Sequence, residues 1–365
     1  MPSGDLLTVT DRGLFCEAGD FFVDPWRPVD RAVVTHAHGD HICRGCGVYI
    51  CSREGRDVLR MRIGQDAIIE TLDYGEAVFP RGIQVSLHPA GHIRGSAQVR
   101  IERNGEVWCA SGDYKLAVDP TCTGFETVRC HTFITESTFG LPIYRWQPAR
   151  VIADEVNDWW QANQQAGRTS VLFAYALGKA QRLISGVNPE IGPIYCHGAV
   201  ESVNQAYRRN DVPLPATALV SSDLKRQDWS DSLIVAPPSA RGTTWMRRFG
   251  DVSTGFASGW MTVRGARRRR SVDRGFTLSD HADWPGLQEA IHDTGASRVL
   301  VTHGSIAVMV RWLQEQGLDA APLKTRFEGE TGEETAEDYL ENMPTAAAEV
   351  PETIPPALDA EDDES

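Results

Sequence analysis

The 365-residue sequence lacks any apolar run that approaches the roughly 18 residues needed to span a bilayer, so we expect no membrane helix and no membrane partner. Its first residues, Met1 to Asp5, contain neither a basic stretch nor an apolar one, and we expect no signal peptide there. Both absences predict a cytoplasmic protein.

Basic residues are absent after Arg326. Of the 50 acidic residues, 14 lie between Glu328 and Glu364, which leaves 36 acidic against 36 basic residues in 1–327. The formal net charge of −14 therefore belongs to residues 327–365, which are rich in Glu, Ala, Pro and Thr and bury too little apolar area to fold alone. We expect a disordered acidic tail that aids solubility or, as a sharper hypothesis, competes with a polyanionic ligand for a basic groove. The low pI does not exclude a polyanionic substrate.

The sequence also has no second cysteine pair to match Cys43 and Cys46, which with Cys51 have spacing reminiscent of a zinc knuckle. We therefore expect no structural zinc there. The eight cysteines lie mostly in apolar or strand-like surroundings, and a cytosolic chain would keep them reduced.

The order of expected elements indicates an α/β protein of about two domains, at roughly 150 residues per domain. Strands that alternate with helices in the middle of the chain predict a parallel-sheet insert. The strands are expected over Arg31–Thr35, Ile83–Leu87, Gln98–Ile101, Val107–Ala110, Thr132–Thr135, Ser170–Tyr175, Pro193–Cys196, Leu233–Ala236 and Arg298–Thr302. The helices are expected over Ala149–Ala166, Lys179–Ser185, Val200–Arg208, Trp284–Asp293 and Ile306–Gln316.

The most informative motif is an apolar strand that ends in His36-Ala37-His38-Gly39-Asp40-His41. Residues i and i+2 of an extended strand point to the same side, so His36 and His38 can hold one metal. The turn at Gly39 places Asp40 and His41 opposite, facing a second metal. Imidazole and carboxylate ligands suit zinc, and also manganese or iron.

Three further ligand-type residues stand at strand ends near glycines, namely His92, Asp113 and His303. Each of these histidines alone would be read as an ordinary loop residue. Together with the first motif, the three residues complete a two-metal set.

With these residues in place, the sequence resembles the metallo-β-lactamase superfamily and, within it, the β-CASP nucleases. That group includes the mRNA cleavage endonuclease, RNase J and the Artemis-type DNA nucleases. The matching positions are Asp24, His36, His38, Asp40, His41, His92, Asp113, Glu136, His281 and His303. Ser258–Met261, the Arg267–Arg270 run and Gly275–Trp284 look like the bacterial ligase-associated DNA exonucleases, whose gene neighbours an ATP-dependent ligase and a helicase.

The resemblance implies an αββα sandwich, residues 1–144 and 273–326, interrupted by a β-CASP insert over residues 145–272. It implies two divalent metals, with zinc first and manganese as an alternative. Metal one would be held by His36, His38 and His92, and metal two by Asp40, His41 and His303, with Asp113 bridging.

The same resemblance assigns catalytic roles to Asp40, His281, Glu136 and Asp24. Two close cations lower the pKa of a shared water, so that hydroxide exists at neutral pH. His281, paired with Glu136, is the candidate general acid, because a neighbouring carboxylate favours the protonated imidazole. Asp24 is expected to orient a ligand loop rather than to bind metal.

Nucleic-acid contacts are expected from a basic run in which six of the eleven residues Arg264–Arg274 are arginine. Arg267, Arg268, Arg269 and Arg270 would follow the phosphate backbone. Lys179 opens a helix after Gly178 and would hold a substrate phosphate. Trp260, near the run, would stack on a base.

These expectations predict a DNA exonuclease that acts on single strands or DNA ends in repair, in the 5′→3′ direction, with a ligase and a helicase as partners by resemblance. An RNA-processing nuclease of the RNase J or cleavage-factor type is the alternative. A small-molecule hydrolase would not need the large insert, and a non-catalytic relative would have lost ligands that are all present here.

Overall fold

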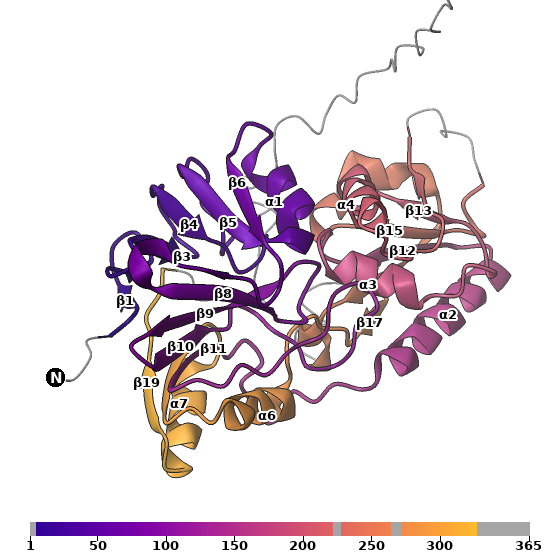
Figure 1. The fold of residues 1–365 in the computed structure, drawn as a ribbon. Helices are drawn as coiled ribbons and strands as arrows, with labels where there is room; N and C mark the ends of the chain where they lie inside the picture. The colour runs from indigo at the N-terminus through magenta and orange to yellow at the C-terminus, as the bar shows by residue number, and fades with distance from the viewer. Residues whose placement is uncertain (1–4, 222–227, 264–271, 327–365) are drawn as a thin grey trace, which may run out of the picture.

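A computed structural model describes residues 5–221, 228–263 and 272–326 (Figure 1). The acidic tail and Arg267–Arg270 lie outside the described residues. Within the described residues, no helix is long and apolar enough to cross a membrane.

Two mixed sheets form the first body of the protein. The first sheet has the strand order β1 (Thr8–Val9), β2 (Leu14–Cys16), β3 (Phe21–Val23), β4 (Arg31–Val33), β5 (Val48–Ser52) and β6 (Ile69–Leu72). The second has the order β19 (Asp319–Pro322), β18 (Arg298–Thr302), β11 (Thr132–Glu136), β10 (Glu106–Ala110), β9 (Ala97–Arg103), β8 (Gln84–Pro89) and β7 (Ala77–Val78). In this second sheet β10, β11, β18 and β19 run parallel, so their C-terminal ends meet at one edge.

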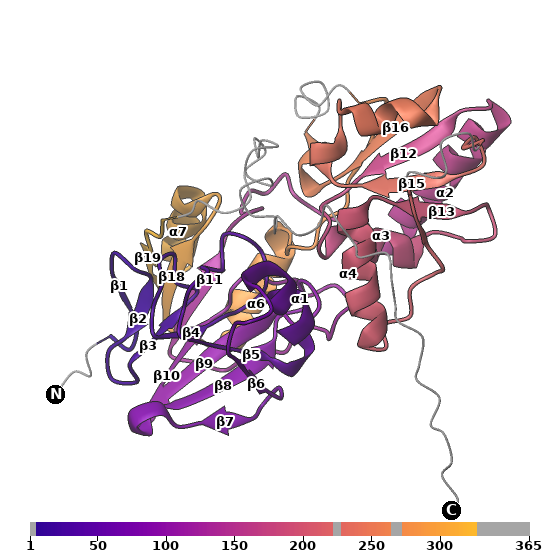
Figure 2. The same ribbon diagram turned by 90° about the horizontal axis from the view of Figure 1, so that it is seen from above.

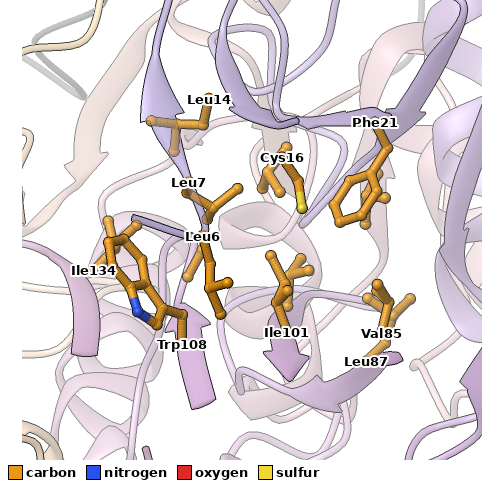
Figure 3. Close-up of a cluster of buried hydrophobic side chains, with 14 of the residues drawn as sticks. Leu6, Leu7, Leu14, Cys16, Phe21, Val85, Leu87, Ile101, Trp108 and Ile134 are labelled. Atoms are coloured by element: carbon orange, nitrogen blue, oxygen red, sulfur yellow. The ribbon is translucent and has the colours of Figure 1, made fainter. Parts of the chain in front are cut away.

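The core lies between the two sheets (Figure 3). Alternate residues of each strand enter it: Val85 and Leu87 of β8 are buried there, together with Phe21 from the facing sheet and Trp108 of β10. This period of two is the geometry of an extended strand with one face on a core. The packed sheets give the loops at their edge a fixed base.

Helices cover both outer faces of the sheets. The second sheet carries α6 (Trp284–Thr294) and α7 (Ile306–Glu315). Asp283 begins α6, because its carboxylate accepts a hydrogen bond from the Gly286 N–H at 3.0 Å. The first sheet carries α1 (Arg56–Ile63), beside which α4 (Gly198–Arg209) of the insert packs in both views (Figures 1 and 2). The layers therefore run helix, sheet, sheet, helix.

The middle of the chain forms a second body around an all-parallel sheet. Its strand order is β14 (Ala218–Leu219), β13 (Ile194–Cys196), β15 (Leu233–Ala236), β12 (Thr169–Phe173), β16 (Val252–Ala257) and β17 (Arg274–Phe276). One face packs on α2 (Ala149–Gln165) and α3 (Lys179–Gly186). Short 3-10 helices also occur, at η1 (Arg53–Gly55), η2 (Pro80–Gly82), η4 (Pro238–Ala240), η5 (Thr244–Phe249) and η6 (Gly259–Thr262).

Two segments of the chain connect the first body to the second, and they meet at Tyr144, Trp146, Asp283 and Trp284, a region that we call the neck. The Trp284 N–H donates to the carbonyl of Tyr144 at 3.1 Å, and the Trp146 N–H donates to the carboxylate of Asp283 at 2.8 Å. The segment that leaves the first body and the segment that returns to it are thus hydrogen-bonded to one another. Figure 2 shows the second body on one side of the first, with α3 and α4 facing it.

The expected α/β class is confirmed, as is the parallel sheet in the middle of the chain. Each expected helix and strand is present, with bounds that agree to within two residues; the strand expected over Arg31–Thr35, for example, ends at Val33. Thr35 leaves the strand because its N–H and hydroxyl both bind Asp24, at 2.8 and 2.6 Å.

Candidate metal centre

The histidine and aspartate side chains of the sequence motifs converge at one edge of the two sheets. His36 and His41 follow β4, Asp113 follows β10 and His303 follows β18, so parallel strands deliver them to the same edge. His92 comes from the loop between β8 and β9. All of these side chains are buried.

The carboxylate of Asp113 lies at the centre of the group. Its Oδ2 is 3.5 Å from His36 Nε2, 3.4 Å from His41 Nε2 and 3.9 Å from His92 Nε2. Its Oδ1 is 3.6 Å from His303 Nδ1. The Asp113 carboxylate thus lies within 3.9 Å of histidines from both halves of the predicted ligand set.

The ligand atoms fall into two clusters with metal-like spacing. Groups with this spacing also form around His281, namely His92, Asp280 and His281, and Asp113, Glu136 and His281. The predicted ligands divide into His36, His38, His92 and Asp113, and then Asp40, His41 and His303, with the ligand atoms of each group within 4.8 Å of one another. This division is the one expected for metals one and two. In the described residues no such cluster contains a cysteine, and the eight cysteines are free thiols.

Four of the histidines have their outer ring nitrogen fixed by a protein acceptor. The acceptors are the Thr35 hydroxyl for His36 at 3.1 Å, the Leu177 carbonyl for His38 at 3.2 Å, Asp24 for His41 at 2.7 Å and the Asp280 carbonyl for His92 at 2.9 Å. The inner nitrogen of each ring is then the one left to bind a metal. Such outer contacts fix the tautomer and the orientation of metal-binding histidines.

The inner atoms lack ordinary hydrogen-bond partners. His36 Nε2, His41 Nε2 and Asp113 Oδ1 are buried and make no hydrogen bond within the structure. His38 Nδ1 and His92 Nε2 face each other at 3.0 Å, although each ring donates its proton elsewhere. Buried polar atoms require a partner, and two lone pairs that face one another repel unless a cation binds between them. The donor set therefore fits divalent metal ions.

The pKa shifts agree with this interpretation for His36 and His92 but not for His41. Burial alone would lower the pKa of His41, but Asp113 and Asp40 outweigh it and raise the pKa well above its ordinary value. Burial, followed by the neighbouring His41, lowers the pKa of His36, and burial followed by His281 lowers that of His92, which favours the neutral imidazoles that bind metals. Burial alone would raise the pKa of Asp113, but His41 and His281 outweigh it and hold the pKa well below its usual range.

Asp24 holds the start of the motif together without entering the centre. Its Oδ2 accepts hydrogen bonds from the Thr35 hydroxyl at 2.6 Å and from His41 Nδ1 at 2.7 Å. Asp24 has a φ of +43°, a left-handed conformation that is costly for a residue with a side chain. This backbone conformation places the Asp24 carboxylate against Thr35 and His41.

His303 reaches the centre through a tight turn. It has a φ of +54°, and Gly304 after it has a φ of +72°. A Cβ on Gly304 would collide with the carbonyl of Ser137, whose hydroxyl binds the His303 carbonyl. The turn after β18 is therefore packed closely against Ser137 and Thr138, which directly follow Glu136 at the end of β11.

His281 and Glu136 form a pair beside the metal-type clusters. His281 Nδ1 lies 2.9 Å from Glu136 Oε2 and 3.9 Å from Asp113 Oδ2. Burial alone would lower the pKa of His281, but Glu136 and Asp113 outweigh it and raise the pKa to about 10. The Tyr114 N–H also donates to Glu136, at 2.8 Å, and fixes its carboxylate.

Of the residues predicted to contact nucleic acid, Lys179 and Trp260 lie among the described residues. The Lys179 side chain is only 1% exposed and lies 3.2 Å from Asp280, so the expectation that it holds a substrate phosphate is not met in this structure. Trp260 is half-buried in η6 and packs on Phe139, with ring centroids 4.7 Å apart. Arg267, Arg268, Arg269 and Arg270 lie outside the described residues.

Two residues of the site, Thr35 and Asp280, were not predicted from the sequence. Thr35 and Asp280 stand beside motif histidines, and adjacency was the available hint. Lys115, two residues after Asp113, donates to the Ser279 carbonyl from a buried position. Burial and the nearby Arg182 lower the pKa of Lys115 well below its ordinary value.

A small pocket of about 50 Å³ opens beside the second cluster. Asp40, His41 and His303 line it together with Trp26 and Thr325. A space of this size has room for a few water molecules next to the ligand atoms.

No family model matches the chain, but curated proteins do. It is 29% identical over 311 residues to a probable DNA ligase of Opitutus terrae, covering 84% of this chain and 30% of the ligase. It is 25% identical over 228 residues to an RNase J-like protein of Methanocaldococcus jannaschii, covering 54% of each. It is 30% identical over 118 residues to endoribonuclease YSH1 of Saccharomyces cerevisiae, covering 32% of this chain and 15% of that enzyme.

The chain therefore spans between about a seventh and about half of the length of these relatives. Among solved structures, a protein of unknown function from Enterococcus faecalis V583 has a similar fold, with a TM-score of 0.56 and 10% sequence identity over 82% of this chain and 80% of that one.

Proposed function

Because the chain belongs to the β-CASP nucleases of the metallo-β-lactamase fold, we propose that it is a metal-dependent exonuclease acting on single-stranded DNA or DNA ends in repair, in the 5′→3′ direction. The observation that carries the hydrolytic part is the Asp113 carboxylate, which lies 3.4 to 3.9 Å from imidazoles of both metal-type clusters. The match to the ligase relative over 84% of the chain favours DNA.

The parallel-sheet body in the middle of the chain is, on this proposal, the β-CASP insert over residues 145–272. Residues 1–144 and 273–326 would form the metallo-β-lactamase sandwich, although β17 (Arg274–Phe276) pairs with β16 in the parallel sheet and so lies with the second body. The hydrogen-bonded neck at Tyr144, Trp146, Asp283 and Trp284 supports boundaries in this region.

The candidate centre would hold two divalent metals, zinc first and manganese as the alternative. His36, His38 and His92 would bind one, Asp40, His41 and His303 the other, and Asp113 both. When bound, such ions polarise a phosphate and supply a nucleophilic water at neutral pH.

The chain's own residues supply orientation and a proton. Asp24 and Thr35 hold His41 and His36 so that the inner nitrogens face Asp113. His281 carries a proton that Glu136 stabilises, and as general acid it would protonate the leaving oxygen of the phosphodiester. Asp40 would act as a ligand of the second metal, together with His41 and His303.

The same comparison suggests which proteins the chain acts with. The relative named as a probable DNA ligase is a longer protein, of which this chain matches 30%. We propose that the present chain acts together with an ATP-dependent DNA ligase, and with a helicase by family resemblance.

An RNA-processing nuclease is the second candidate. The matches to an RNase J-like protein and to endoribonuclease YSH1 favour it, although they cover 54% and 32% of this chain. Trp260 is the described residue we propose for stacking on a base of either nucleic acid.

One gel distinguishes the two candidates. It compares a 5′-phosphorylated single-stranded DNA with the RNA of the same sequence, each labelled internally and at one end, with added zinc or manganese. Stepwise loss from the 5′ end of the DNA, with intact RNA, is the expected result. Preferential cutting of RNA would replace the first proposal by the second, and the Asp113→Ala protein controls for contaminating nucleases.

A further inference from the structure

The segment Leu177–Lys179 of the insert touches the candidate metal centre at three points. The Leu177 carbonyl accepts a hydrogen bond from His38 Nε2 at 3.2 Å. Gly178, with a φ of +88°, lies against Ile93, and a Cβ there would collide with the Ile93 side chain. Lys179 Nζ lies 3.2 Å from Asp280 Oδ1. The three contacts reach the loops that carry His38, His92 and His281.

Asp280 is the link between Lys179 and the reacting groups. Its carbonyl accepts a hydrogen bond from His92 Nδ1 at 2.9 Å, and its carboxylate lies 4.0 Å from Nε2 of the adjacent His281. A displacement of Asp280 would therefore move a predicted metal ligand and the predicted proton donor together.

The Lys179–Asp280 ion pair is buried, with side chains 1% and 2% exposed. Lys179 also lies over the ring of Tyr175, 4.2 Å from its centroid. A second buried ion pair, Arg182 with Asp119 at 3.2 Å, crosses between the same two bodies one helical turn along α3. Removing one partner of a buried pair leaves an uncompensated charge, which is far more costly than removing both.

We propose that Lys179 is a positioning residue whose buried ion pair with Asp280 aligns His92 and His281, so that docking of the insert and assembly of the metal centre are one event. Lys179 then acts through Asp280 and does not contact the substrate. The rate measurements below rest on the proposed nuclease function, whereas the metal-binding measurements do not.

The test is a double-mutant cycle with Lys179→Met, Asp280→Asn and the combined variant. In a cleavage assay, Lys179→Met should lower kcat about 10- to 100-fold with KM within about twofold, since misplacement of reacting groups by a fraction of an ångström acts on the chemical step. The combined variant should be more active than the product of the two single losses predicts, because it buries no unpaired charge.

A second readout uses the metal-free protein and Zn²⁺ alone. Lys179→Met should weaken Zn²⁺ binding about 10-fold in competition with a chelator, as loss of an outer contact to a metal ligand does. Lys179→Arg keeps the charge and should stay closer to the wild type in both assays; it also serves where Lys179→Met does not fold.

The matched control is the exposed ion pair Arg53–Asp73, whose side chains are 60% and 63% exposed. Arg53→Met, Asp73→Asn and their combination should leave kcat, KM and Zn²⁺ binding unchanged, as expected of a surface pair.

Two outcomes would overturn the proposal. One is a raised KM with unchanged kcat in Lys179→Met and no compensation by Asp280→Asn, which is the signature of a direct phosphate contact. The other is Zn²⁺ binding that none of the Lys179 and Asp280 variants alters. If the wild type cuts neither DNA nor RNA, the proposed function fails, and the Zn²⁺ cycle still decides the role of Lys179.

Discussion

His281 Nδ1 lies 2.9 Å from Glu136 Oε2, although the two residues are 145 positions apart in the chain. Glu136 ends β11, and His281 follows the insert that separates β11 from β18. After the insert, the chain therefore returns to the end of β11, and the imidazole of His281 lies within hydrogen-bond distance of the Glu136 carboxylate.

The first prediction concerns this pair. His281→Ala should lower kcat about 10²- to 10⁴-fold, the usual contribution of general acid–base catalysis, while metal content stays at the wild-type level. Steady-state cleavage and elemental analysis of the same preparation check both points. His292→Ala, at an exposed histidine with an 89% exposed side chain, should change neither quantity. Loss of metal from His281→Ala would assign His281 to the ligand set instead.

The second prediction concerns the shared carboxylate. Asp113→Ala should bind less metal and should lose at least about 1,000-fold in activity, because the ions supply several kcal/mol of transition-state stabilisation and 1.4 kcal/mol is tenfold. A chelator should inactivate the wild type to the same extent, and Zn²⁺ or Mn²⁺ should restore it. Asp66→Ala, at an exposed position, is the control. Full activity after exhaustive chelation would exclude a metal mechanism.

The third prediction concerns Asp24, which touches His41 and Thr35 but belongs to neither metal-type cluster. Asp24→Asn should weaken metal binding about 10- to 100-fold, because an amide accepts fewer hydrogen bonds and no longer fixes the tautomer of His41. Metal titration of the chelator-treated protein measures the change. Asp11→Asn, whose carboxylate is 74% exposed, should titrate as the wild type does. A complete loss of one metal would instead make Asp24 a ligand.

The fourth prediction separates backbone conformation from close packing. Gly317, with a φ of +85° and open space around it, should tolerate alanine at a cost of about 1 kcal/mol in the free energy of unfolding. Gly304→Ala should cost at least about 3 kcal/mol, because its Cβ would also meet the Ser137 backbone. Urea unfolding of both variants gives the two values. Equal costs in the two variants would contradict this prediction and show that the backbone around Ser137 shifts to make room for the added Cβ.

The metal-type clusters could be predicted from the sequence because their geometry is local. His36, His38, Asp40 and His41 lie within six residues of one another in the loop that follows β4, so four of the seven predicted ligands come from a single short segment. The other ligands were added by pattern alone, and the parallel strands brought Asp113 and His303 to the same edge.

Lys179 shows where such reasoning stops. A lysine at the first turn of a helix looks the same in sequence whether it faces solvent or a carboxylate from a distant loop, and here it faces Asp280. Several strands were not predicted, among them β5 and β16, which contain five and six residues. The strands β1, β7 and β14 contain two residues each, too few to show any alternation.

The neck at Tyr144, Trp146, Asp283 and Trp284 has an evolutionary consequence. Since both connections to the insert meet at one place, a larger or smaller domain can be grafted between them without changing the register of β11 on β18. Any replacement must still offer a carbonyl to His38 and a cation to Asp280.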